Sequence, residues 1–565
     1  MTEALKINDE RRAAAESAMG GLGARNVLHE PTEITTRDGI TLATDVFHPD
    51  GEERGPVILM RTPYGRAIWH SDGVYWASHG YRFVLQDCRG TSSYFAEADD
   101  GADTVAWIER APWFDGSLFL HGASYLGFAA WATASNRPAS LRAMSVQIYS
   151  ADRVSSWYPG GTFGLDVALP WAAGQAAVAD KPERLASSDE LAPLEDGAAP
   201  FQSIDAAFNH LPLQEADIAT GGTAIPFYRE RLRYGRDDPH WAPLDFGHLL
   251  SDLDVPVLLI DGWYDYHRRY MWQDYRTLRA RPNSDARLVI GPWFHVATDP
   301  KVVNEETRRW FDSHRDAAPA DARPQGSTSL RLYVTPDRGW IETPEWPPAG
   351  STSTTLYLSA GQTVGSVADA DAAVDTYAYD PSDPTPSVGI SSLGGPDAAL
   401  PTDNRALEAR PDVLTYTAEA SDSPVTIVGA ARARLFVNST EPTADFFVRI
   451  TDVHPDGTSM NIVDGITRIP HTAELTADEP VEIEVDLGPV AHELAAGHAL
   501  RVQVSSGAHP MYARNPGGTE SPATTTCLFP ATQTVHLGGD HASRLLLDLY
   551  EGELPIGSNA QAGKA

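Results

Sequence analysis

The hydrophobic pattern of this 565-residue chain changes character along its length, and these changes constrain the fold more than any other feature. From about residue 30 to 145, short apolar runs such as TLATDVF, PVILMR, RFVLQD and SLFLHGA alternate with helix-prone stretches. This alternation is typical of a mostly parallel sheet covered by helices on both faces. From about 146 to 245 β-branched runs become few, which predicts a helical insertion. Strand signals then resume in VPVLLIDGWYD and ARLVIGPWFH.

Beyond about residue 325 the apolar pattern becomes alternating. SLRLYV, TTLYLS, ARLFV, VEIEVDL, LRVQVSS and RLLLDLY are short and are separated by Pro, Gly, Asp and Ser. A period of two leaves one face buried and one in water, which predicts an antiparallel sandwich or jelly roll. Because single cores rarely exceed about 250–300 residues, we expect several domains. The expected units are an N-terminal helical extension over 1–29, an α/β domain over 30–145 and 246–325, a helical cap over 146–245, and a β sandwich over 326–565.

Charge and composition exclude several functional classes. The chain has 43 basic and 77 acidic residues, a net charge of −34, which argues against nucleic-acid and anionic-membrane partners. Cys88 and Cys527 are too few and too far apart for a zinc cage or a disulfide framework. The polar N-terminus has no secretory core, and no apolar run approaches the roughly 18 residues of a membrane span, so we expect a soluble, cytoplasmic protein. Without HExxH, CxxC, EF-hand or P-loop spacings, no metal or nucleotide cofactor is predicted.

The strongest local signal is SLFLHGASYLGFAAWATAS, in which an apolar run ends at Gly122, Ser124 follows, and a helix-prone stretch begins at once. Such a strand–turn–helix places a serine on a tight turn at the carboxyl edge of a sheet, where its Oγ can reach a substrate. Gly122 and Gly127 leave room for close approach of the backbone. The spacing is G-x-S-x-x-G rather than G-x-S-x-G, and the alternative is an ordinary turn serine.

A serine hydroxyl needs a base to accept its proton and a third group to hold that base in the right tautomer. Asp265 follows VPVLLIDGW and His295 follows ARLVIGPW, each just past the carboxyl end of an expected strand. The order Ser, Asp, His is that of α/β-hydrolases. Each role has an alternative candidate. His267 could be the base instead of His295, but it fits better as a pocket-wall residue. Asp261 could be the acid instead of Asp265, but it abuts the strand directly, where burial is expected.

Acyl transfer also needs hydrogen-bond donors for the oxyanion that develops in the transition state. The backbone N–H of Tyr125 is one natural donor, because it follows the nucleophile. In RTPYGR, Pro63 stiffens a loop after a strand, and Tyr64 could present its hydroxyl. The pattern predicts a serine hydrolase for ester or amide bonds, without separating the two. The competing hypothesis is a carbohydrate-binding protein built on the sandwich, with an inert hydrolase domain.

Five motifs carry a family resemblance: RTPYGR, QDCRGTS, WFDGSLFLHGASYLG, DGWYDYH and IGPWFH. Their order resembles that of the bacterial cocaine esterase (CocE/NonD) family, relatives of X-prolyl dipeptidyl peptidases, and the resemblance extends from about residue 30 to 550. It implies an α/β-hydrolase domain with a helical cap and a C-terminal jelly roll, a small-molecule ester or amide substrate, and a homodimer. By this resemblance, the catalytic residues are Ser124, Asp265, His295, Tyr64 and Tyr125.

The resemblance also suggests which residues line the substrate pocket. Trp157 of SSWYPGG and Trp171 of LPW resemble cap residues that line the acyl pocket, and plain cap packing is the alternative. His267 stands where the enzyme that names the family has an aromatic residue, and Leu393 stands where a bulkier apolar side chain would close the pocket. Benzoyl esters are therefore not the expected substrates. The neighbouring Tyr266 is also expected at the pocket.

Arg66 departs from a second group of relatives. It stands two residues after Tyr64, where related amino-acid ester hydrolases place an acidic amine-binding residue. An arginine would repel an α-ammonium group, which disfavours aminopeptidase-like activity. The hypothesis is that Arg66 attracts a carboxylated acyl chain, and the alternative is a solvated surface arginine.

Overall fold

A computed structural model describes residues 5–89, 95–179, 204–282, 284–295, 297–315, 329–389, 400–476 and 478–550. The chain opens with α1 (Asp9–Met19), capped by the Asn8 side chain and ended by Gly20 at a φ of 67°. This confirms the predicted N-terminal helix with a glycine stop, since that backbone conformation favours glycine. No helix within the described ranges combines the length and apolar character that crossing a bilayer requires.

The first half of the chain forms one eleven-stranded sheet with the order β1-β2-β3-β5-β4-β6-β7-β8-β9-β10-β11. The run from β5 to β10 in this order is parallel, and the remaining pairs are antiparallel. The strands are β1 (Leu5–Lys6), β2 (Val27–Thr35), β3 (Thr41–Pro49), β4 (Gly55–Thr62), β5 (Arg82–Asp87), β6 (Phe114–Ala123), β7 (Leu141–Gln147), β8 (Val257–Gly262), β9 (Ala286–Gly291), β10 (Leu330–Val334) and β11 (Gly339–Thr343). The predicted parallel sheet is confirmed.

Helices cover both faces of this sheet, because alternate strand residues feed two cores. On β4, Val57 and Leu59 join the core under α3, α4 and α10, whereas Ile58 and Met60 join the core under α1, α2 and α11. Period-two burial on both faces is what a sheet between two helical layers requires. The covering elements besides α1 are η1 (Arg66–Trp69), α2 (His70–Ser78), α3 (Glu97–Arg110), α4 (Tyr125–Ala134), α10 (Arg268–Arg279) and α11 (Pro300–His314).

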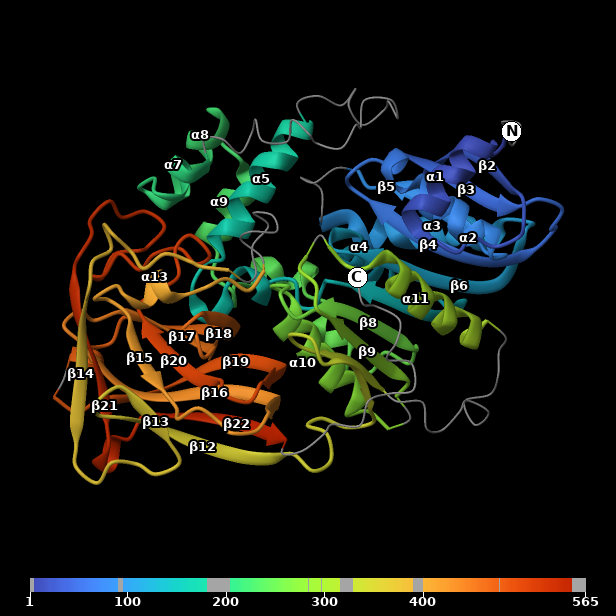
Figure 1. The fold of residues 1–565 in the computed structure, drawn as a ribbon. Coiled ribbons are helices and arrows are strands. Elements are labelled where there is room, and N and C mark those ends of the chain that lie inside the picture. The colour runs from blue at the N-terminus through green and yellow to red at the C-terminus, as the bar shows by residue number, and fades with distance from the viewer. Residues whose placement is uncertain are drawn as a thin grey trace.

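Between β7 and β8 the described residues form only helices and turns, as the predicted helical insertion requires. Leu165, Leu169 and Trp241 of this cap share one core with Tyr125 and Phe128 of α4. The cap therefore packs directly on the helix that follows Ser124, and its helices lie beside the sheet in Figure 1. Its elements are η3 (Ser155–Trp157), η4 (Pro159–Gly161), α5 (Leu165–Ala179), α7 (Ile204–Phe208), η5 (Leu213–Glu215), α8 (Ala216–Gly221), α9 (Pro226–Arg233), η6 (Pro239–Leu244) and η7 (Gly247–Leu249).

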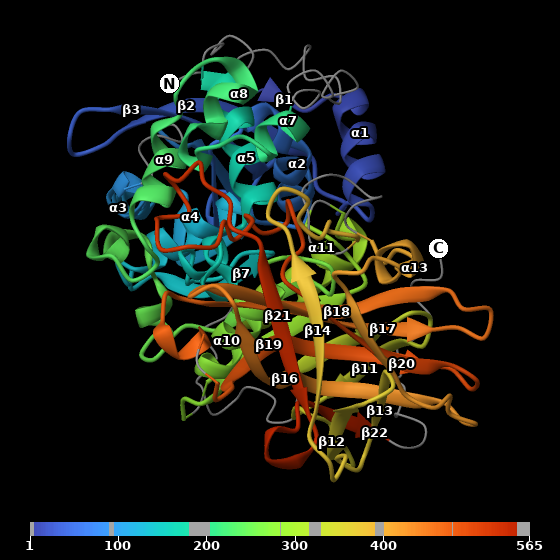
Figure 2. The same cartoon turned by 90° about the vertical axis from the view of Figure 1, so that its left-hand side faces the viewer.

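The C-terminal part is a β sandwich around its own apolar core, visible below the cap in Figure 2. Its strand order is β14-β21-β16-β22-β12-β13-β15-β20-β17-β18, with β19 on β16, and every pair except β13–β15 is antiparallel. The elements are β12 (Thr352–Ser359), β13 (Thr363–Gly365), β14 (Ala373–Tyr379), α13 (Arg405–Glu408), β15 (Leu414–Thr417), β16 (Val425–Ser439), β17 (Ala444–Val453), β18 (Ser459–Ile469), η9 (Ala473–Thr476), β19 (Val481–Leu494), β20 (Ala499–Ser505), β21 (Ala531–Leu537), η10 (Gly539–His541) and β22 (Arg544–Tyr550).

One strand assignment from the sequence was wrong. SLRLYV was predicted to open the sandwich, but β10 pairs in parallel with β9 and, through a hairpin, with β11. The expected boundary at 325/326 therefore falls before the last two strands of the first sheet. Apolar alternation reports that a strand is buried, but it does not report which sheet buries it. The same hairpin touches the sandwich, because Thr335 forms an isolated bridge with His492.

Candidate active site

Ser124 occupies a strained turn between β6 and α4. Its φ of 55° and ψ of −128° lie in a region that residues other than glycine rarely adopt, and its backbone N–H donates to Gln147 O of β7 at 3.0 Å. Such strain persists where the surrounding structure fixes it. A Cβ at Gly122 would lie 2.3 Å from the Leu126 carbonyl oxygen, and one at Gly127 would lie 3.0 Å from the Val146 side chain. The predicted tight turn, with its need for both glycines, is present.

Three side chains from separate loops converge at this turn. Ser124 Oγ lies 2.9 Å from His295 Nε2, and His295 Nδ1 lies 2.7 Å from Asp265 Oδ2. They meet because the carboxyl ends of the parallel strands β6, β8 and β9 lie at the same edge of the sheet. When Nδ1–H donates to the carboxylate, Nε2 is left with the lone pair that can accept a hydroxyl proton. The geometry is that of a Ser–His–Asp triad.

Two carboxylates lie near the base, and their surroundings differ. Asp265 Oδ1 accepts the backbone N–H of His267 at 2.6 Å, which fixes the carboxylate while Oδ2 faces His295. Asp261 lies inside β8 and is fully buried, as its position against the strand predicted. Burial, together with the negative charge of Asp265, raises the pKa of Asp261 well above its usual range. The surroundings of the inner carboxyl therefore favour its neutral form.

Tyr266 and His267 flank the base. The Tyr266 hydroxyl lies 3.4 Å from His295 Nε2, and the two rings are 4.6 Å apart. The His267 ring is buried between Tyr149 and Tyr266, at 4.4 Å from each, and 5.9 Å from the His295 ring. Burial lowers the pKa of His267 well below its usual range, so it stays neutral. His267 thus lies buried beside the triad, and it is His295, not His267, that contacts Ser124.

Two hydrogen-bond donors belong to residues next to Ser124. Tyr64 follows β4, and its hydroxyl interacts with Ser124 and accepts a hydrogen bond from Trp171 Nε1 at 3.4 Å. Burial raises the pKa of Tyr64, so the hydroxyl keeps its proton. Tyr125 is the first residue of α4, and the N–H groups of a helix's first turn have no partner within the helix. The hydroxyl of Tyr64 and the amide of Tyr125 are both candidates for an oxyanion hole.

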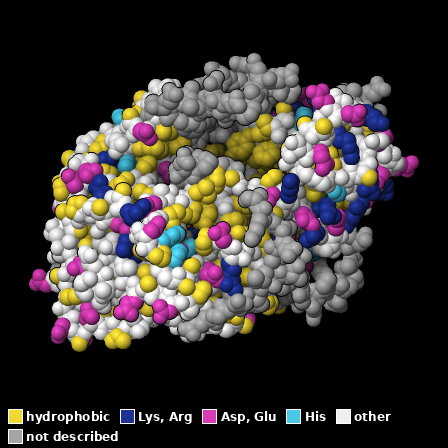
Figure 3. Space-filling model, viewed as in Figure 1, with side chains coloured by type: hydrophobic (Ala, Val, Ile, Leu, Met, Phe, Trp, Pro, Cys, Tyr) yellow, Lys and Arg dark blue, Asp and Glu magenta, His cyan; other side chains and the backbone are white. Residues whose placement is uncertain are grey.

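Two aromatic residues of the cap, Trp171 and Trp157, pack in the same region. Trp171 stacks on the Tyr125 ring with centroids 6.3 Å apart, which places it beside Tyr64 as well. Trp157 is buried against Trp241, with ring centroids 5.0 Å apart. In the space-filling view, hydrophobic side chains gather in a hollow between the cap and the hydrolase sheet (Figure 3). Leu393, the remaining expected pocket residue, lies outside the described residues.

Two buried arginines in this region were not predicted from the sequence. The Arg153 guanidinium lies 4.1 Å from the Phe128 ring centroid and 5.1 Å from that of Tyr125. The Arg231 guanidinium lies 4.2 Å from the Trp157 ring centroid and 5.1 Å from that of Trp171. Arginine stacks well on aromatic rings, so these side chains hold the cap aromatics in place. Nothing in the local sequence separates them from surface arginines.

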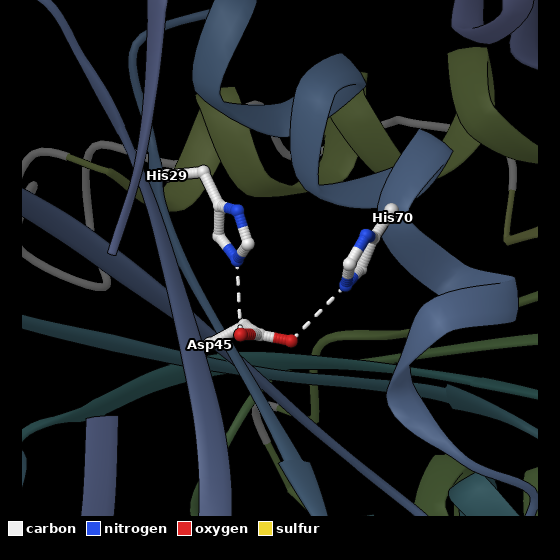
Figure 4. Close-up of side chains that lie close together, drawn as sticks. All are labelled: His29, Asp45 and His70. Atoms are coloured by element: carbon white, nitrogen blue, oxygen red, sulfur yellow. Dashed lines mark hydrogen bonds and ion pairs between the residues drawn. The ribbon is translucent and has the colours of Figure 1, made fainter. Parts of the chain in front are cut away.

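Arg66 contacts protein carboxylates. Its Nε donates to Asp45 Oδ2 at 3.0 Å and its Nη1 to Asp87 Oδ2 at 3.2 Å. Asp45 on β3 and Asp87 at the end of β5 come from adjacent strands, which creates a paired acceptor for the guanidinium. Figure 4 shows that Asp45 is also held by His29 and His70. The observed contacts therefore do not support a role in binding a substrate carboxylate. The same contacts show that the alternative was wrong, because Arg66 is not a solvated surface arginine.

Family profiles match both parts of the chain. The profile of the X-Pro dipeptidyl-peptidase (S15) family matches residues 38–297, and that of the X-Pro dipeptidyl-peptidase C-terminal non-catalytic domain matches residues 322–546. Cocaine esterase of Rhodococcus sp. (strain MB1 Bresler) is 31% identical, covering 92% of this chain and 98% of its own. A putative serine esterase of Mycobacterium bovis is 24% identical, covering 93% and 96%.

Solved structures agree on the fold. An aminopeptidase from a marine sediment Thaumarchaeota archaeon has a TM-score of 0.76 at 22% identity, covering 93% of this chain and 97% of its own. An α-amino acid ester hydrolase has a TM-score of 0.76 at 21% identity, covering 92% and 96%. Both matches span the hydrolase part and the sandwich, which is the two-part architecture predicted from the sequence. The chain belongs to the cocaine esterase (CocE/NonD) family, as its motifs predicted, and it is a serine hydrolase.

Proposed function

We propose that this protein is a carboxylesterase that cleaves small-molecule esters through an acyl-enzyme on Ser124. The observation that carries the proposal is the continuous hydrogen-bonded chain from Ser124 Oγ through His295 to Asp265, with steps of 2.9 and 2.7 Å. Near-attack geometry of this kind lets the hydroxyl lose its proton as it attacks. The 31% identity to cocaine esterase over nearly the whole chain supports ester cleavage.

In the proposed cycle, Ser124 Oγ attacks the ester carbonyl carbon while His295 Nε2 takes the hydroxyl proton. The tetrahedral intermediate collapses, the C–O bond to the alcohol breaks, and His295 returns the proton to the departing oxygen. A water molecule then gives a proton to His295 and attacks the acyl carbon. The second tetrahedral intermediate collapses, the C–O bond to Ser124 breaks, and His295 returns the proton to Ser124 Oγ as the carboxylic acid is released. Asp265 stabilises the imidazolium that forms in each half of the cycle.

The oxyanion of both tetrahedral intermediates is proposed to lie between the Tyr64 hydroxyl and the Tyr125 amide. Tyr64→Phe removes one donor and keeps the ring, so we expect kcat to fall by roughly 10²–10³-fold with little change in folding. Steady-state kinetics on a chromogenic ester give this value. Trp171→Phe is the matched control, because it removes a hydrogen bond to the same hydroxyl but keeps that hydroxyl. A fall in kcat equal to that of Tyr64→Phe would contradict the oxyanion role.

The acyl pocket is proposed to be walled by Trp157, Trp171, Tyr266 and His267, with Leu393 of the segment SVGISSLGG. A small pocket where the cap, α10 and the sandwich meet is also lined by Asp265 and Tyr266. Because Ser124 is not part of its described lining, we do not assign the acyl group to it.

For Arg66 we propose a positioning role, in which its ion pairs with Asp45 and Asp87 hold the loop that carries Tyr64. Arg66→Ala is therefore expected to lower the rates on a neutral ester and on its dicarboxylic half-ester by the same factor. Rates measured on the matched pair of substrates, for wild type and variant, test this directly. A loss confined to the half-ester would restore the substrate-binding hypothesis.

The second candidate is amide cleavage by the same groups, favoured by the match to the X-Pro dipeptidyl-peptidase profile. An amide differs in having a poorer leaving group that His295 must protonate. A panel of chromogenic esters and the corresponding anilides, of varied acyl size and charge, separates the two. Faster turnover of anilides, including X-Pro anilides, would replace the esterase proposal.

Covalent labelling tests whether the site reacts at all. A fluorophosphonate probe should label the protein at Ser124, identified by peptide mass spectrometry. Absence of labelling would favour the inert, carbohydrate-binding hypothesis. The homodimer implied by the resemblance and the cytoplasmic location expected from the sequence are part of this proposal, and light scattering and cell fractionation check them.

A further inference from the structure

One carboxylate and three imidazoles meet at an end of the sandwich, in a group that we call the sandwich histidine cluster: Asp452, His454, His492 and His498. Asp452 lies on β17 and His492 on β19. His454 is the first residue after β17 and His498 the last before β20, and these strands pair side by side. The cluster therefore forms from three strands that the fold brings together, at positions far apart in the sequence.

Both Asp452 oxygens face imidazole nitrogens. Oδ1 lies 2.7 Å from His498 Nδ1, and Oδ2 lies 3.2 Å from His492 Nε2 and 3.8 Å from His454 Nε2. In a tetrahedral zinc site with bonds of roughly 2.0–2.1 Å, ligand atoms are about 3.3–3.4 Å apart. The three separations from Asp452 bracket this value, and the ligand atoms of Asp452, His454 and His498 all lie within 4.8 Å of one another, so side-chain shifts would suffice for these three residues to bind an ion.

The charge of the cluster also fits a cation. Asp452 is 3% exposed, and within the described ranges all its ion pairs are with histidines rather than Arg or Lys. With neutral imidazoles, the buried carboxylate keeps a charge of about −1 that a divalent ion would compensate. The side chains of His454 and His498 are 38% and 16% exposed, which gives an ion a route from solvent.

In the cluster of Figure 4, by contrast, the carboxylate is already paired with an arginine. There Arg66 Nε lies 3.0 Å from Asp45 Oδ2, the same oxygen that His70 contacts at 3.1 Å. A guanidinium is always charged, so it would repel a metal ion at that carboxylate. His29, Asp45 and His70 therefore provide an internal comparison with similar ligand types and a different charge.

His492 has the oriented second nitrogen that metal-binding histidines usually show. Its Nδ1 lies 2.9 Å from Thr335 Oγ1, in the β10–β11 hairpin of the hydrolase sheet. Backbone bonds from Thr335 N to Ala491 O at 3.0 Å and from Glu493 N to Thr335 O at 2.8 Å hold this hydroxyl against β19. The hydrolase part thus orients a ligand that belongs to the sandwich.

We propose that the sandwich histidine cluster binds a divalent transition-metal ion, zinc by preference, and fastens the sandwich to the β10–β11 hairpin. Two imidazole nitrogens and one carboxylate oxygen, from His454, His498 and Asp452, lie close enough together to form a donor set that suits zinc, and His492, which contacts the same carboxylate, would supply the fourth ligand. The site is structural, because none of its residues belongs to the Ser124 cluster. Binding would stabilise the folded protein in proportion to the affinity and the free zinc concentration.

The test uses the full-length protein, stripped with a chelator and then equilibrated with Zn²⁺ alone. We expect about one equivalent of zinc by inductively coupled plasma mass spectrometry, with a higher Tm than the stripped protein. His498→Gln and His454→Gln should lose this zinc. Thr335→Val should keep the ligands but bind roughly 10–100-fold more weakly.

Two control variants separate this site from adventitious binding. His248→Gln changes an exposed histidine on η7, and His70→Gln changes the cluster of Figure 4; both should retain the zinc. Zinc lost in His70→Gln and kept in His498→Gln would overturn the proposal, as would substoichiometric zinc in the wild type. Because His454 is partly exposed, His454→Gln is the variant expected to fold in any case, and circular dichroism verifies this.

Discussion

Ser124→Ala is expected to lower kcat on a chromogenic ester by on the order of 10⁶-fold, to a rate close to background. The alanine removes the oxygen that lies 2.9 Å from His295 Nε2, and with it the covalent step. Binding contacts in the cap would remain, so the substrate should still bind. Active-site titration and progress curves on highly purified protein measure the residual rate.

Ser135→Ala is the matched control, because Ser135 caps the other end of α4 and its hydroxyl donates to Ala132 O at 2.7 Å. This variant should keep the wild-type kcat. If Ser124→Ala retained the rate of Ser135→Ala, another group would be the nucleophile and the proposed acyl-enzyme would be wrong.

The triad could be predicted from the sequence because each member lies directly after an apolar strand. Parallel strands that end at one edge of a sheet deliver their following loops to one place, so Ser124, Asp265 and His295 needed only the right order. The glycines around Ser124 were predictable for the same local reason, since close backbone approach excludes a Cβ. Local sequence was sufficient to predict the site residues that lie at the ends of strands.

Other features depend on contacts between distant segments, and local sequence patterns did not predict them. Arg66 could be placed near the oxyanion loop, but not its partners on β3 and β5, which lie about twenty residues away on either side. Arg153 and Arg231 look like surface arginines until the cap folds over them. The sandwich histidine cluster escaped because metal motifs detect ligands that are close in sequence, whereas Asp452 and His492 are brought together by the packing of β17 against β19.

β10 shows the same limit at the level of the fold. Its residues are almost all buried, and its alternating sequence fits either sheet equally well. Only the parallel register with β9 assigns it to the hydrolase sheet. Pairing between strands is a property of the whole chain, so a boundary drawn from local pattern fell before this strand.

Asp265→Asn is expected to lower kcat by roughly 10⁴-fold while leaving the fold intact. An asparagine can donate its amide N–H to His295 Nδ1, which moves the ring proton to Nε2. Nε2 then cannot accept the proton of Ser124, and no carboxylate remains to stabilise the imidazolium. The pH–rate profile and kcat on one ester, with circular dichroism as the check on folding, measure the effect.

Asp261→Asn is the sharpest control, because it makes the same chemical change four residues earlier. Burial and the charge of Asp265 raise the pKa of Asp261 well above its usual range, which favours the neutral carboxyl, and an amide closely matches that form in size and charge. Its Oδ1 accepts the Gly262 N–H at 2.7 Å, a bond that the amide oxygen can keep. This variant should retain most of kcat. If instead Asp261→Asn were inactive and Asp265→Asn active, the inner carboxylate would be the ionised one that orients His295, and the division of roles between the two acids would have to be reversed.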